Sequence, residues 1–269
     1  MSLKIVVLAK QVPDTRNVGK DAMKADGTIN RAALPAIFNP EDLNALEQAL
    51  RLKDAHPGST VTILTMGPGR AADIIREGLF RGADNGYLLT DRAFAGADTL
   101  ATSYALATAI RKIGDCDIII GGRQAIDGDT AQVGPQIAEK LHLPQVSYVE
   151  EVVEAAADHV VVKRQFEDGY HIIKIKTPCL LTAIAELATP RYMSVRGIVE
   201  AYEKEIKVLG FEDLKDGLEL DMIGLKGSPT NVYQSFTKEV KGAGTILEGL
   251  SADEAVKAIM DKLEAKFII

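Results

Sequence analysis

Tryptophan is absent from this 269-residue sequence, and aromatic residues make up only 5% of it, so no aromatic cage identifies a ligand site. Cysteine occurs twice. Cys116 and Cys179 both adjoin apolar runs, so we expect buried small residues rather than a disulfide or a redox pair. The four histidines lie far apart in the sequence, without the spacing of metal ligands, and we expect no metal site.

Long apolar runs and basic stripes are also lacking. The first apolar run is confined between Lys4 and Lys10, too short for a signal peptide, and no run approaches a membrane span. The net charge of −7, with no basic stripe, argues against nucleic acid as a partner. We therefore expect a cytoplasmic protein without membrane insertion, whose mildly acidic surface suits a protein partner.

Apolar runs alternate with helical patterns over the first half of the chain. This order predicts an α/β fold with a doubly wound, mostly parallel sheet, and a nucleotide at the carboxyl ends of its strands. A β-rich segment follows at 146–185, where Asp168-Gly169 indicates a hairpin between two runs. The strands of the parallel part are expected at residues 3–9, 61–66, 87–90 and 117–120.

The chain is organised around the stretch from Cys116 to Leu143. An apolar strand ends on Gly121-Gly122, a loop with two aspartates and glycine follows, and a helix is marked by Val133, Ile137 and Leu141. Asp129 could cap this helix, or Gly134 could cap it with Pro135 at the first position. Backbone amides between the strand and the helix, backed by the helix dipole, are suited to hold phosphate.

Three further helix starts are readable. Asn39 is expected to cap a helix that begins at Pro40, with Glu41 and Asp42 against its dipole. Asp98 is expected to cap another. The stretch 67–72 matches the fingerprint G-x-G-x-x-A, with Asp91 near the distance of a ribose-binding acid. We favour a tight strand-to-helix turn there, because Pro68 lacks an amide N–H and the fingerprint normally follows the first strand.

The pattern changes after residue 195, where charged stretches mix with isolated apolar residues. We expect a nucleotide-binding domain over residues 1–195 and an arm over 196–269 that docks on a partner. A capping box at Ser251 and Glu254 predicts a last helix. Its apolar stripe comprises Val256, Ile259, Met260, Leu263 and Phe267.

The loop Gly122–Thr130 closely resembles the adenine-nucleotide loop in the beta (small) subunit of electron transfer flavoproteins. The version at Asp127–Pro135 is similar to the electron-bifurcating branch, whose beta subunit carries FAD where the ordinary branch carries AMP. The opening Lys10–Asp14, the loop Asp91–Thr99 and Gly227–Thr230 strengthen this resemblance, which covers nearly the whole chain.

The resemblance implies three sets of site residues. The cofactor-binding set is Leu8, Ala9, Lys10, Asn39, Asp42, Thr65, Met66, Gly122, Arg123, Gln124, Ala125, Asp127, Gly128, Asp129, Thr130, Ala131, Gln132, Val133 and Gly134. Asp91, Arg92, Ala93 and Phe94 are expected near the NADH site. The partner-recognition loop comprises Glu186, Leu187, Ala188, Thr189, Pro190, Arg191 and Tyr192, with Leu187 as its apolar anchor on an acyl-CoA dehydrogenase.

The same resemblance implies a heterodimer with the alpha (large) subunit. In that family branch NADH gives hydride to the FAD, one electron goes to ferredoxin or flavodoxin, and the other reaches an acyl-CoA dehydrogenase through the FAD of the large subunit. No side chain of this chain need act as acid, base or nucleophile. Two alternatives stay open: a non-bifurcating beta subunit with structural AMP, and an AMP- or ATP-binding regulatory domain.

Overall fold

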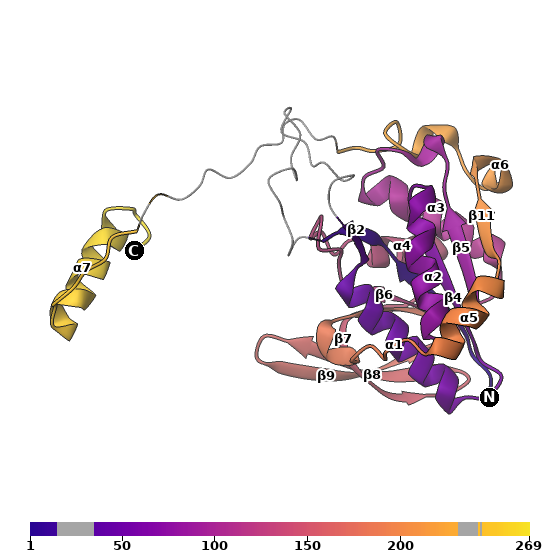
Figure 1. Cartoon of the computed structure of the whole chain (residues 1–269), viewed down its shortest axis with the longest axis horizontal. Coiled ribbons are helices and arrows are strands. Elements are labelled where there is room, and N and C mark those ends of the chain that lie inside the picture. The colour runs from indigo at the N-terminus through magenta and orange to yellow at the C-terminus, as the bar shows by residue number, and fades with distance from the viewer. Residues whose placement is uncertain (15–34, 231–241, 243) are drawn as a thin grey trace. The chain divides into compact units, whose positions relative to one another are not determined.

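The computed structural model describes residues 1–14, 35–230, 242 and 244–269 (Figure 1). Contacts divide the chain into two compact units, residues 1–234 and 235–269, which are described separately. The first unit holds the sheet and all but one of the described α-helices.

A nine-stranded sheet forms the centre of the first unit, in the order β11-β5-β4-β1-β6-β10-β7-β8-β9. Neighbouring strands from β11 to β7 pair in parallel, and β8 and β9 continue the sheet antiparallel. The predicted α/β fold is therefore confirmed. The strands are β1 Lys4–Ala9, β4 Thr60–Met66, β5 Asn85–Leu89, β6 Ile118–Gly122, β7 Gln145–Ala155, β8 His159–Phe166, β9 Gly169–Lys176, β10 Cys179–Ala183 and β11 Ile206–Leu209; β2 Gln11–Pro13 pairs apart with β3 Ala36–Phe38.

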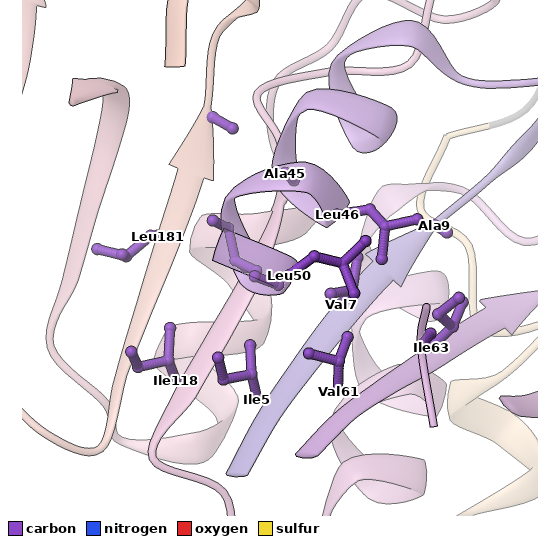
Figure 2. Packing of buried hydrophobic residues seen from close by; sticks show 14 of the residues in the cluster. Ile5, Val7, Ala9, Ala45, Leu46, Leu50, Val61, Ile63, Ile118 and Leu181 are labelled. Carbon is purple, nitrogen blue, oxygen red and sulfur yellow. The ribbon is translucent and has the colours of Figure 1, made fainter. Parts of the chain in front are cut away.

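Helices cover both faces of this sheet because its central strands are apolar on both sides. Ile5 and Val7 of β1 pack in one core cluster with side chains of α1 (Pro40–Ala55) (Figure 2). Side chains of α2 (Ala72–Arg81) belong to the same cluster. Val6 and Leu8 point the other way, into a second cluster with α3 (Thr99–Ile113) and α4 (Val133–Leu141). This arrangement leaves the carboxyl ends of the strands between two helical layers.

The hairpin and most boundaries of helices and strands agree with those predicted from the sequence, but three details differ. Helix α4 begins at Val133 with Gln132 at its cap, so neither Asp129 nor Gly134 caps it. Pro135 is accommodated inside the first turn because the N–H groups there make no intrahelical bond. The expectation for cysteine is confirmed for Cys179, which is buried, whereas Cys116 is only half-buried.

The segment after residue 195 contributes to the sheet. Helix α5 (Val195–Glu203) packs on α2, where the Arg76 guanidinium donates to the carbonyls of Ala201 and Lys204, and β11 pairs in parallel with β5. Helix α6 (Phe211–Leu214) follows β11. The docking of residues 196–269 on a large subunit stays a prediction.

The second unit contains helix α7 (Ala252–Glu264). Its predicted capping box is confirmed: the Ser251 Oγ accepts from the Glu254 N–H at 3.4 Å, and the Glu254 carboxylate accepts from the Ser251 N–H at 2.9 Å. Within this unit, Val256, Ile259 and Met260 of the apolar stripe are exposed. Of the helices that the structure describes, none is both long and apolar enough to span a membrane.

Candidate functional site

The carboxyl ends of β1, β4 and β6 open into a cavity of about 460 Å³, within the size range of small-molecule sites. Its wall is completed by the start of α3 and by the loop between β6 and α4. The lining includes Leu8, Ala9, Lys10, Gln11, Asp42, Leu64, Met66, Gly67, Pro68, Arg70, Ala97, Asp98, Thr99, Thr102, Leu106 and residues 121–125 and 127–134.

All of the residues predicted to bind the cofactor line this cavity except Asn39 and Thr65. Thr65 faces the other side of the sheet because alternate residues of a strand point to opposite faces. Its side chain is fully buried beside α1 and α2, and its Oγ1 lacks a hydrogen-bond partner among the residues described. Met66, the next residue, faces the side of the sheet on which the cavity lies, and it lines the cavity.

Asn39 takes the N-cap position of α1 and Pro40 begins the helix, as expected, but the Asn39 side chain makes no capping hydrogen bond. Its Nδ2 donates to the Gln124 carbonyl at 2.9 Å, and its Oδ1 accepts from the Ile126 N–H at 3.1 Å. Asn39 is also completely buried. It therefore supports the loop of the cavity from behind rather than contributing to the cavity surface.

Asp42 joins the ends of two strands. Its carboxylate accepts from the Lys10 N–H after β1 and from the Gly122 N–H of β6, both at 2.8 Å. Burial raises the pKa of Asp42 to about 7, against the opposing effect of these two hydrogen bonds and of Asn39. The geometry of the cavity floor thus depends on one buried carboxyl group.

Two ion pairs offset charge around the cavity. The Lys10 Nζ lies 2.6 Å from the Asp127 Oδ1, and the Arg123 Nη2 lies 2.8 Å from the Glu41 Oε1. The other oxygen of Glu41 accepts from the Gln124 N–H at 3.0 Å. Burial raises the pKa of Glu41 despite these contacts. The first turn of α1 is therefore the scaffold of the loop after β6.

The loop between β6 and α4 contains two residues in an uncommon backbone conformation. Asp129 and Ala131 adopt the left-handed conformation, with φ of 49° and 52°, and Gln132 returns to the right-handed region. Such alternation turns neighbouring N–H groups to one side, which makes a concave anion-binding surface. The N–H groups of Val133 and Gly134 belong to the first turn of α4, where an intrahelical partner is lacking.

The four residues predicted near NADH lie outside the lining of the described cavity. Asp91 accepts from the Ala93 N–H at 3.0 Å and the Phe211 N–H at 3.1 Å, and these bonds, led by the one from Ala93, hold its pKa below the ordinary value. Phe94 is buried in the core. The loop continues to Asp98 and Thr99, which do line the cavity.

Sequence reasoning did not identify Asp98, Thr99 or Thr102 as cavity residues. Their place in the chain could have identified them. Asp98 caps the helix that follows β5, and in such a fold the starts of helices lie at the same edge of the sheet as the carboxyl ends of the strands. The Asp98 carboxylate accepts hydrogen bonds from the backbone N–H groups of Leu100 and Ala101 at 2.9 and 3.0 Å. It also accepts from the N–H and the hydroxyl of Thr230.

The predicted partner-recognition loop lies beside α1. Leu187, the expected anchor, is only 5% exposed and packs in the core of this chain, together with the buried Ala188. Its place is the turn of residues Ala185–Leu187, directly after β10. The exposed apolar side chains come later, at Tyr192 (90%) and Val195 (82%).

Comparison with known proteins gives a consistent result. Residues 26–214 match the model of the electron transfer flavoprotein domain. The chain is 53% identical to the acryloyl-CoA reductase electron transfer subunit gamma of Anaerotignum propionicum, over 99% of this chain and 100% of that protein. It is 49% identical to the caffeyl-CoA reductase-Etf complex subunit CarD of Acetobacterium woodii and 51% identical to the electron transfer flavoprotein subunit beta of Clostridium acetobutylicum, each over 99% and 100%.

Proposed function

The chain belongs to the electron transfer flavoprotein family as a beta subunit, and we propose that it binds FAD in a heterodimer with the alpha subunit. A bound FAD would supply the redox chemistry: hydride acceptance from NADH and release of single electrons, one to ferredoxin or flavodoxin and one, by way of the large subunit, to an acyl-CoA dehydrogenase. The chain itself would bind, orient and shield the cofactor.

The observation that supports this proposal is that the loop between β6 and α4 lines the cavity with a glycine and two left-handed residues. Residues 127–134 all contribute to the lining, and the left-handed turns at Asp129 and Ala131 direct N–H groups to one side. Two charged side chains of the lining are offset by ion pairs close by, Asp127 with Lys10 and Arg123 with Glu41. Phosphate oxygens would therefore be held chiefly by backbone amides and by the positive end of the α4 dipole.

The apolar part of the cavity lining suits an adenine base. Leu64 and Met66 of β4 and Leu106 of α3 supply apolar surface to it. A flat aromatic ring gains free energy from such contacts, whereas the phosphates stay near the amides. This division of apolar and amide-rich surface fits the adenosine phosphate part that AMP and FAD share.

The bifurcating assignment is supported by two further observations. The loop Asp127-Gly128-Asp129-Thr130 carries the resemblance to that branch, and two relatives of full length are named as parts of acryloyl-CoA and caffeyl-CoA reductase systems. In this proposal Asp91, Arg92, Ala93 and Phe94 lie near the NADH site of the assembled complex.

We also propose that residues 196–269 dock on the large subunit. The exposed apolar side chains Val256, Ile259 and Met260 share one stripe of α7, which needs a covering partner. Loss of the heterodimer after removal of α7 would support this role, and an intact heterodimer would contradict it.

The deciding experiment is the cofactor content of the chain co-purified with its alpha subunit. FAD and AMP would be released with acid and counted by chromatography, and the flavin absorbance would be followed after addition of NADH. We expect FAD at both subunits, no AMP, and bleaching by NADH. One FAD with one AMP and no response to NADH would instead identify a non-bifurcating beta subunit.

A further inference from the structure

The segment 223–230 lies against the loop 91–99, although the two are far apart in sequence. The Leu225 N–H donates to the Ala95 carbonyl at 3.0 Å. Ile223, only 2% exposed, packs in the core cluster that contains side chains of α3. The segment is therefore anchored on the loop by a backbone hydrogen bond and by burial.

The backbones of the segment and the loop are in direct contact at Gly224. This residue has a φ of 57°, and a Cβ there would lie 2.2 Å from the Ala93 carbonyl oxygen. No side chain fits at such a distance. The close approach fixes the segment relative to the loop.

Ser228 joins the segment to the start of α3. Its Oγ accepts from the Asp98 backbone N–H at 2.8 Å and donates to the Gly224 carbonyl at 2.6 Å. The residue is only 7% exposed, so the hydroxyl supplies partners that water does not readily replace. Removal of this hydroxyl would leave both an N–H group and a carbonyl without their partner.

The two oxygens of the Asp98 carboxylate bind different parts of the chain. Oδ1 accepts from the N–H groups at the start of α3, and Oδ2 accepts from the Thr230 Oγ1 at 2.8 Å and from the Thr230 N–H at 3.2 Å. Burial acts to raise the pKa of Asp98, but the hydrogen bonds, led by the one from Ala101, outweigh it and hold that pKa below the ordinary value. The carboxylate is therefore ionised at neutral pH and accepts from both parts at once.

The same contacts continue to the loop between β6 and α4. Asp98, Thr99 and Thr102 line the cavity, and the Thr99 Oγ1 donates to the Gln132 Oε1 at 2.8 Å. Gln132 belongs to that loop and also lines the cavity. Hydrogen bonds thus run without a gap from the segment 223–230, through the start of α3, to the opposite wall of the cavity.

We propose that Ser228 is a positioning residue for the adenosine phosphate part of the cofactor: through Asp98 and Thr99 it fixes the cavity wall at the start of α3, so that the cofactor and the segment 223–230 stabilise each other. This inference rests on the proposed function. A wall that is ordered before the cofactor arrives loses less conformational entropy on binding, so the cofactor is held more tightly. Because such coupling is reciprocal, the cofactor stabilises the contacts of the segment by the same factor.

The test uses the whole heterodimer and measures the FAD and AMP that it retains after dialysis at increasing dilution. We expect Ser228→Ala to lower the affinity for the nucleotide of this subunit roughly tenfold, the effect of losing about one buried hydrogen bond. Ser103→Ala is the matched control. Ser103 is a fully buried residue of α3 whose hydroxyl donates to the Leu100 carbonyl, and it lies outside the lining of the described cavity.

Retention in Ser103→Ala should equal that of the wild type. Equal retention in the wild type and Ser228→Ala overturns the proposal. An equal loss in Ser228→Ala and Ser103→Ala also overturns it, because the loss then follows from removing any buried hydroxyl near α3.

Amide hydrogen exchange gives the reciprocal measurement. The N–H groups of Leu225 and Thr230 are bonded to Ala95 and Asp98. They should exchange more slowly in the heterodimer loaded with cofactor than in the depleted heterodimer, and Ser228→Ala should remove most of this difference. Exchange that does not respond to the cofactor in the wild type overturns the proposal.

If Ser228→Ala does not assemble, Thr230→Val decides, because Thr230 is exposed and the change removes its Oγ1 contact with Asp98. Retention must then fall about two- to threefold, as for the loss of one exposed hydrogen bond, and unchanged retention overturns the proposal. A wild-type heterodimer with one FAD and no AMP overturns the proposed function instead. Full retention in the wild type and in the variants overturns this inference alone.

Discussion

The Nζ of Lys10 lies 2.6 Å from the Oδ1 of Asp127, and this ion pair joins the end of β1 to the loop after β6 across the mouth of the cavity. The Asp127 side chain is only 8% exposed, whereas that of Lys10 is 48% exposed. The aspartate therefore depends on the lysine for its partner more than the lysine depends on the aspartate. Removal of the two partners should have unequal effects.

Lys10→Ala should weaken cofactor retention by about tenfold, because it leaves the Asp127 carboxylate unpaired beside the expected phosphates. Lys10→Ala combined with Asp127→Asn should recover most of the loss, since the lone charge is then gone. The measurement is FAD and AMP content after dialysis at increasing dilution. An equal loss of cofactor in the single and the double variant would show that the unpaired charge of Asp127 is not what weakens cofactor binding.

Asn39→Ala should destabilise the first unit by roughly 2 to 4 kcal/mol, because the Gln124 carbonyl and the Ile126 N–H both lose their partner. Cofactor content should fall with it. Ser194→Ala is the control: it removes an ordinary helix cap at a cost of about 1 kcal/mol and leaves the loop intact. Denaturant unfolding of both variants gives the comparison, and equal losses would contradict a loop-supporting role for Asn39.

The central loop could be predicted because a short apolar strand, a glycine pair and a helical stripe follow one another without interruption. Thr65 could not be placed correctly by the same reasoning. In a parallel sheet both faces of a strand are apolar, so Val61 and Ile63 do not reveal which face opens into the cavity. The helices, which the sequence does not place, decide it.

Long-range contacts explain the other differences. Leu187 resembles an exposed anchor only until Asn44 and Glu47 are brought beside its segment from 141 to 144 residues away. Strand β11 lies at the edge of the sheet, where it pairs with β5 alone, and it has a single buried side chain, Leu209. Its sequence therefore lacks the apolar run that predicts a buried strand. Both cases depend on tertiary packing, which overrides local pattern.

Asp42 should make the first unit less stable as the pH rises from about 4 to about 7. Its pKa is raised to about 7 from 3.8, so in this window the folded chain binds a proton that the unfolded chain has released. The free energy of unfolding therefore falls with pH there and levels off above the folded pKa. Asp42→Asn should remove most of this slope and leave the part due to Glu41, whose pKa burial also raises. Chemical unfolding at several pH values tests it, and an undiminished slope in Asp42→Asn would assign the slope to another group.

Gly122→Ala, at the end of β6, and Gly128→Ala, in the loop that follows, form a matched pair. A Cβ at Gly122 would lie 2.5 Å from the Asp42 Oδ1 and 2.8 Å from the Asp42 backbone nitrogen, so α1 would have to move. We expect a loss of about 1 to 3 kcal/mol and reduced cofactor content. A Cβ at Gly128 meets nothing within 4 Å, and this variant should stay within about 0.5 kcal/mol of the wild type. Thermal unfolding and cofactor content measure both variants. Because the two glycines differ in what a methyl group would contact, equal effects would mean that loop entropy, rather than the approach of α1 to β6, explains the glycine at position 122.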